Sequence, residues 1–400
     1  MCDRLGGAAG LKQFRERLHA HRLKLILDFV PNHLGLDHAW VRERPDLFVQ
    51  GSPRAPGTFS EKTVDGRRWL AHGRDPYFPP WADTVQLDYR QPATHVAMRH
   101  QLHAVAELCD GVRCDMAMLV TNEVFARTWA DFPCRVPQPP VEEFWKETIA
   151  SVRRISPEFL FLAEVYWNLE AHLQSLGFDF TYHKTVYDHL VARRYPPLQQ
   201  HLLAASPSFL QASAHFLENH DEPRIASLLQ PAEHRAAALL TLALPGMKIL
   251  HEGQLSGWVK KAGIHFARRL VEPGQAEVSS FYESLLRILP TTALGRGKAV
   301  VLRPQEALPG NTTAENTVAV LWREDGLVFE FDLAVVNLAP HPSQCRLQWK
   351  MEGTPKQSWK IRNLLGREPI LFPESEQQGP TICLDLPAHA AWILHGEPVP

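Results

Sequence analysis

The chain has 400 residues, 45% of them apolar and 22% charged, so a disordered or fibrous protein is excluded. Its 42 basic and 44 acidic side chains give a formal net charge of −2, so neither nucleic acid nor a membrane surface is an expected partner. No apolar run approaches the roughly 18 residues that span a bilayer. With roughly 150 residues per domain, this length predicts two or three domains.

Six cysteines are too few and too irregularly spaced for a disulfide scaffold or a zinc site, and we interpret them as free thiols in a reducing compartment. The first residues lack the apolar core of a signal peptide. Both features predict a cytoplasmic location. The sequence does not indicate an oligomeric state.

Strands and helices alternate over 1–289, which is the pattern of a parallel sheet surrounded by helices. The predicted strands are 23–30, 112–119, 159–166, 178–183, 213–220 and 247–253. Amphipathic helices are expected at about 11–21, 94–108, 141–154, 185–193 and 232–243. The Pro-rich piece 195–197 is interpreted as a short linker.

Two further regions follow a different pattern. The segment 34–93 has no strong period and is too long for a plain connection, so we expect an inserted loop or small subdomain with a role in function. Over 290–400, short alternating strands predict an antiparallel β-sandwich domain. These strands are 298–303, 317–322, 333–337, 345–349 and 381–385.

Polar residues lie at the ends of four predicted strands. They are Asp28 with Asn32 and His33, Arg113 with Asp115, Glu164, and the run from Glu218 to Asp221. In a parallel α/β barrel these strand ends open on one face, where active sites are built. Arg113 and Asp115 share a face of their strand, so Arg113 is a partner that holds Asp115 ionised. A single such carboxylate is as readily a structural salt bridge, but four strand ends favour a site.

Four strings in this order carry a family resemblance: DFVPNH (28–33), GVRCDMAM (111–118), AEVYW (163–167) and FLENHD (216–221). They resemble the four signature regions of the α-amylase superfamily, glycoside hydrolase family 13. The resemblance covers nearly the whole chain. It implies an α/β fold: a (β/α)8 TIM-type barrel over 1–289, with 34–93 inserted after the family's third strand, and the β-sandwich behind it.

The resemblance also implies roles for individual residues. Asp115 matches the nucleophile, Glu164 the general acid/base, and Asp221 the carboxylate that stabilises the transition state. His33 and His220 match histidines that hydrogen-bond the sugar, and Asp28 matches a residue that braces the site through Arg113. The implied function is a retaining α-glycosidase or transglycosylase acting on an α-glucan, an oligosaccharide or a small α-glucoside. Such enzymes need two carboxyl groups about 5 Å apart.

The sequence departs from the family in two places. Family members carry two strands before DFVPNH, so only about six of the eight barrel strands are expected in this chain. Three explanations of the two missing strands compete: a start site placed too late, a truncated paralogue, and a partner chain that supplies the missing piece. Asn32 matches a calcium ligand of many members, but Leu119 stands where many have a histidine, so no metal or other cofactor is expected. The alternative function is a catalytically impaired amylase-like binding or assembly protein.

Overall fold

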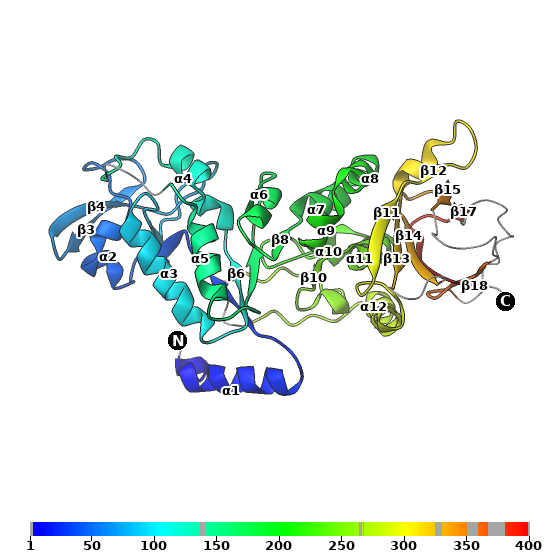
Figure 1. Ribbon diagram of the computed structural model, residues 1–400, viewed down its shortest axis with the longest axis horizontal. Helices are drawn as coiled ribbons and strands as arrows, with labels where there is room; N and C mark the ends of the chain where they lie inside the picture. The colour runs from blue at the N-terminus through cyan, green and yellow to red at the C-terminus, as the bar shows by residue number, and fades with distance from the viewer. Residues whose placement is uncertain are drawn as a thin grey trace. The chain divides into compact units, whose positions relative to one another are not determined.

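The computed structural model describes residues 3–136, 141–263, 266, 268–324, 330–349, 359–366 and 381–398 (Figure 1). The chain forms two compact units, Met1–Tyr182 and His183–Pro400. The predicted class is confirmed: six parallel strands of a partial TIM barrel are accompanied by antiparallel sheets near the C-terminus. Among the described residues, no helix combines the length and the apolar character needed to cross a membrane.

Four parallel strands form the sheet of the first unit. They are β1 (Ile26–Phe29), β6 (Gly111–Cys114), β7 (Leu160–Ala163) and β8 (Phe180–Tyr182), adjacent in that order. Val112 and Phe161 are fully buried, as expected for strands covered on both faces. The register places Asp28 opposite Arg113, so the two side chains can meet.

Helices cover this sheet, and α3 and α5 lie side by side (Figure 1). The helices of the unit are α1 (Gly7–Ala20), α2 (Trp40–Glu43), α3 (Pro92–Ala106), α4 (Asn122–Thr128), α5 (Phe144–Arg153) and α6 (Glu170–Ser175). The apolar face of α5 buries Trp145 and Ile149. The exposed helix α1 is held by the Arg15–Asp110 ion pair of 2.6 Å.

The inserted segment has its own secondary structure. It contains a hairpin of β3 (Thr58–Thr63) and β4 (Gly66–Ala71), and a second pair in which β2 (His33–Gly35) runs antiparallel to β5 (Thr84–Gln86). Gly66 has a φ of 104° at the hairpin turn, a conformation that glycine adopts readily. The β2–β5 pairing places His33 opposite Gln86, and this fixes the position of His33.

The second unit begins with helices and a parallel strand pair. The pair is β9 (Ser213–Phe216) and β10 (Met247–Ile249). The helices are α7 (Lys184–Val191), α8 (Tyr195–Ala204), α9 (Pro207–Gln211), α10 (Ile225–Leu228), α11 (Pro231–Ala243) and α12 (Ala276–Ile288). The interpretation of 195–197 as a linker was wrong. Its prolines occupy the first turn of α8, where a missing N–H costs no helix hydrogen bond.

Two antiparallel sheets complete this unit. One has the order β11-β13-β14-β18-β16 and the other the order β12-β15-β17. The strands are β11 (Lys298–Leu302), β12 (Gln305–Glu306), β13 (Thr317–Arg323), β14 (Phe331–Asn337), β15 (Ser343–Gln348), β16 (Trp359–Asn363), β17 (Thr381–Leu386) and β18 (Ala391–Pro398). Side chains of both sheets share one core, among them Leu333 and Leu347. The other face of the larger sheet packs on α11, where Trp322 Nε1 donates to the carbonyl of Ala243 at 2.7 Å.

Candidate active site

One guanidinium holds three carboxylates at the carboxyl ends of β1, β6 and β7. Arg113 Nη1 donates to Oδ1 of Asp28 at 2.9 Å and to Oδ1 of Asp115 at 2.8 Å. Its Nη2 forms an ion pair of 2.7 Å with Oε2 of Glu164. Although burial works against the charged form, these carboxylates raise the pKa of Arg113, so it stays a cation. The arrangement brings the predicted nucleophile and the predicted acid/base to the same side chain.

Glu164 is the most enclosed member of this group, with 2% of its surface exposed. Burial raises the pKa of Glu164 to about 7, and the negative charge of Asp115 acts in the same direction. Arg113 and two hydrogen bonds oppose the shift. At neutral pH this carboxyl group therefore exchanges a proton readily, which is the property that general acid/base catalysis requires.

The loop after Asp115 is bent so that it meets Glu164. The predicted strand 112–119 ends at Cys114, because Met116 adopts left-handed dihedrals with a φ of 41°. In this conformation the Met116 N–H donates to Oε2 of Glu164 at 2.8 Å. A non-glycine residue in this region costs free energy and persists where its surroundings require it. The bend thus links the loop after Asp115 to the Glu164 carboxyl group.

His33 lies beside this group and carries an aromatic neighbour from the inserted segment. Burial lowers the pKa of His33, against the opposing charge of Asp115, so its ring is neutral near pH 7. The Trp81 ring centroid lies 5.2 Å from that of His33. Tyr77, which is 62% exposed, has its ring centroid 4.9 Å from that of Trp167. Exposed rings of this kind suit the apolar faces of sugars.

His220 and Asp221 belong to the second unit, on the loop after β9. His220 Nε2 lies 3.2 Å from Oδ2 of Asp221, and both side chains are about half exposed. Asn219 Oδ1 accepts the Asp221 N–H at 2.9 Å, which shapes the turn. Below it, the buried Glu218 pairs with Arg224 at 2.6 Å. These contacts fix the loop that carries Asp221.

The residues around Asn32 do not fit a calcium ion. Calcium takes six to eight oxygen ligands. The Gln86 amide nitrogen donates to the carbonyl and the Oδ1 of Asn32, at 2.8 and 2.9 Å, and to the Leu87 carbonyl at 3.0 Å. The three oxygens that could serve as calcium ligands here thus surround the amide nitrogen of Gln86, which occupies the position a cation would need. In the described part of the chain, no three His, Cys, Asp or Glu side chains gather in a metal-binding cluster.

We expect Gln86, and not a cation, to hold this junction. Gln86→Ala should lower the free energy of unfolding by about 2–4 kcal/mol, because it removes the hydrogen bond to the buried Oδ1 of Asn32 and leaves a cavity. Denaturant titration checks this, with Gln101→Ala on the exposed face of α3 as the matched control. The melting temperature of the parent chain should not change on treatment with EDTA. A melting point that EDTA lowers and calcium restores would contradict this account.

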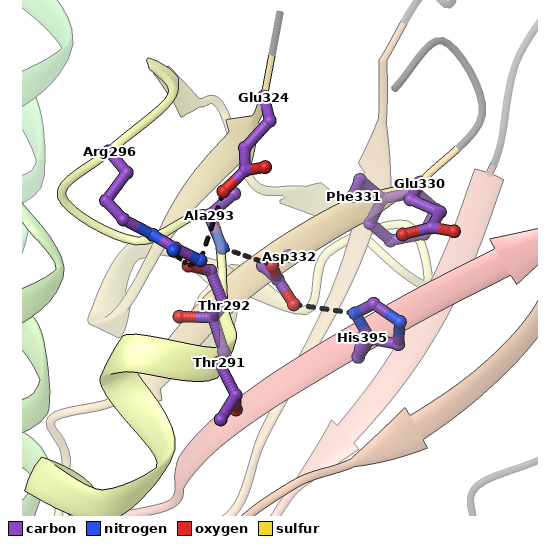
Figure 2. A pocket seen from close by; sticks show the side chains of 9 residues that line it. All are labelled: Thr291, Thr292, Ala293, Arg296, Glu324, Glu330, Phe331, Asp332 and His395. Atoms are coloured by element: carbon purple, nitrogen blue, oxygen red, sulfur yellow. Dashed lines mark hydrogen bonds and ion pairs between the residues drawn. The ribbon is translucent and has the colours of Figure 1, made fainter. Parts of the chain in front are cut away.

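Figure 2 shows a different pocket of about 80 Å³, which lies in the second unit and contains none of the predicted site residues. Asp332 accepts the Ala293 N–H at 2.6 Å and contacts Nδ1 of His395 at 2.9 Å. Arg296 pairs with Glu324 at 3.1 Å in the same view. These contacts join the segment after α12 to the larger antiparallel sheet, so the pocket is structural.

Sequence comparison defines the class of protein to which this site belongs. The model of the alpha amylase catalytic domain matches residues 1–278, and the chain belongs to this family of glycoside hydrolases. It is 28% identical over 270 residues to "Alpha-amylase MalA" of Haloarcula japonica, covering 63% of this chain and 34% of the relative. It is 25% identical over 293 residues to trehalose-6-phosphate hydrolase of Escherichia coli, covering 62% and 51%. The chain thus spans about a third to a half of these curated relatives.

Solved structures agree on the fold. The maltogenic α-amylase AmyB of Thermotoga neapolitana aligns with a TM-score of 0.70 at 19% identity, over 97% of this chain and 81% of that one. The α-amylase of H. orenii aligns with a TM-score of 0.67 at 18% identity, over 98% and 84%. At such identities the likeness shows the fold alone.

Proposed function

We propose that the protein is a retaining α-glycosidase or transglycosylase that acts on α-glucosidic bonds by double displacement. In the first step Asp115 attacks the anomeric carbon while Glu164 protonates the departing oxygen. In the second step Glu164 takes a proton from water or from a sugar hydroxyl. The oxygen of that acceptor then attacks the anomeric carbon and displaces Asp115. The observation that carries this proposal is the Arg113 contact to both carboxylates, with Glu164 buried.

The remaining predicted residues have supporting roles in this mechanism. Asp221 stabilises positive charge on the sugar in the transition state, and His33 and His220 hydrogen-bond sugar hydroxyls. Arg113, braced by Asp28, orients Asp115 through a hydrogen bond. The substrate class is an α-glucan, an oligosaccharide or a small α-glucoside. Both named relatives, an α-amylase and a trehalose-6-phosphate hydrolase, support a substrate of this kind.

Product stereochemistry tests the proposed reaction. The purified chain is mixed with an aryl α-glucoside, and the anomer that forms first is identified by proton NMR before mutarotation. Double displacement inverts the anomeric carbon twice, so the α-anomer should appear first. A β-anomer would contradict the mechanism. Substrate binding without turnover on any α-glucoside would instead favour an amylase-like binding protein.

The raised pKa of Glu164 predicts a pH dependence. The first step needs Glu164 protonated, so kcat/KM should fall about tenfold per unit as pH rises above about 7. The folded chain binds this proton more tightly than the unfolded chain. Glu164 therefore contributes stability that is present below about pH 4.5 and is lost as pH rises toward 7. A rate profile measured from pH 5 to 9 checks the first expectation, and a profile that stays level to pH 9 would contradict it.

A further inference from the structure

The two oxygens of Glu164 have different surroundings. Oε2 accepts the Met116 N–H at 2.8 Å and lies 2.7 Å from the cationic Nη2 of Arg113. An oxygen that already faces an amide proton and a positive charge is a poor place for a third proton. When Glu164 is protonated, the proton therefore resides on Oε1.

The neighbour of Oε1 is a phenol from the same loop. The hydroxyl of Tyr166 lies 2.7 Å from Oε1, in the geometry of a hydrogen bond. The contact is thus made by the polar end of a side chain that is otherwise apolar. A phenolic hydroxyl has one proton and two lone pairs, so it donates to a carboxylate and accepts from a carboxylic acid.

We infer that Tyr166 is a positioning residue for the general acid/base, holding the oxygen of Glu164 that gives and takes the catalytic proton. This inference rests on the proposed function and adds to it the identity of the working oxygen. It also gives a role to the hydroxyl of Tyr166, which an aliphatic side chain at this position would lack.

The catalytic cycle uses both protonation states of Glu164, and the Tyr166 hydroxyl can contact Oε1 in each of them. In the first step Asp115 bonds to the anomeric carbon as the bond from that carbon to the glycosidic oxygen breaks, the Oε1 proton moves to the glycosidic oxygen, and the alcohol leaves. Glu164 is then a carboxylate, and the Tyr166 hydroxyl donates to Oε1. In the second step the carboxylate takes a proton from the incoming water, the resulting oxygen displaces Asp115, and Oε1 is protonated again.

Three other titratable groups interact with Glu164, two of them from β6 and the residue after it, and one from β8. Arg113 on β6 favours its ionised form, and Asp115 opposes it. Tyr182 on β8 interacts with the charges of both Glu164 and Arg113. None of these groups is altered by replacing Tyr166. A change in the titration of Glu164 on that replacement therefore reports the phenolic contact.

Tyr166→Phe tests the inference because it removes one oxygen and keeps the ring. Loss of a hydrogen bond to the ionised form should raise the titration midpoint of Glu164 by about one pH unit. In the pH profile of kcat/KM, measured on an aryl α-glucoside, the descending limb should move to higher pH by the same amount. A packing role alone would lower the rate at every pH and leave the limb in place, and that result would overturn the inference.

A direct titration separates this inference from the proposed activity. The carboxyl signals of the isotope-labelled glutamates are followed by NMR, and the signal lost in Glu164→Gln is assigned to Glu164. Its midpoint should move up in Tyr166→Phe and stay unchanged in Tyr195→Phe, which removes a phenolic hydroxyl that contacts a different glutamate, Glu233. If the parent chain shows no turnover, the proposed function fails while this titration still tests Tyr166. An unmoved midpoint in Tyr166→Phe overturns the inference.

Discussion

Asp115→Asn is expected to lower kcat for an activated aryl α-glucoside by about 10⁴-fold or more. The amide has nearly the same shape, but it cannot form the covalent glycosyl intermediate. A good leaving group does not rescue this variant, because the nucleophile itself is missing. Initial-rate kinetics with an active-site titration of the parent chain measure the loss.

The fold should survive this change. Arg113 keeps Asp28 and Glu164 as partners, so it is not left as an unpaired buried cation. Asp131→Asn, which changes an exposed carboxylate of the same unit, is the matched control and should retain parent activity. Circular dichroism of both variants should match the parent. Full activity in Asp115→Asn would remove Asp115 from the role of nucleophile.

The fold class could be predicted because apolar strand runs and strand-end motifs are local properties of the sequence. The predicted strand 112–119 nevertheless ended early, since no propensity rule anticipates Met116 in a left-handed conformation. That conformation accompanies a hydrogen bond from Met116 to Glu164, a residue distant in the chain. Tertiary contacts decided where this strand stops.

In the candidate site, too, contacts between residues close in sequence could be predicted and contacts between distant residues could not. The pairing of Arg113 with Asp115 follows from their spacing on one strand, and the structure places them 2.8 Å apart. The Gln86 contact to Asn32 does not follow from any spacing, because 54 residues separate the two. The polar role of Tyr166 was also missed, since composition describes a tyrosine as mostly apolar and only geometry locates its hydroxyl.

Glu164→Gln is expected to separate substrates by their leaving groups. A glutamine has no proton to give, so a natural α-glucoside with a poor leaving group should lose about 10³-fold or more in kcat/KM. An aryl α-glucoside with a strongly acidic phenol needs little protonation and should lose far less in this first step. The measurement is kcat/KM for a series of aryl α-glucosides whose leaving phenols differ in pKa. The rate of the variant should fall more steeply than that of the parent chain as the pKa of the phenol rises.

The second step supplies an independent readout of the same residue. Without a general base, the glycosyl intermediate on Asp115 should react slowly with water, so kcat on activated substrates falls even where kcat/KM is kept. Azide needs no deprotonation, and because it attacks from the face of Glu164, it should restore turnover and yield an α-glycosyl azide. Glu142→Gln, an exposed glutamate of the same unit, is the matched control and should show no response to azide. Equal losses on all leaving groups, with no effect of azide, would contradict the acid/base role of Glu164.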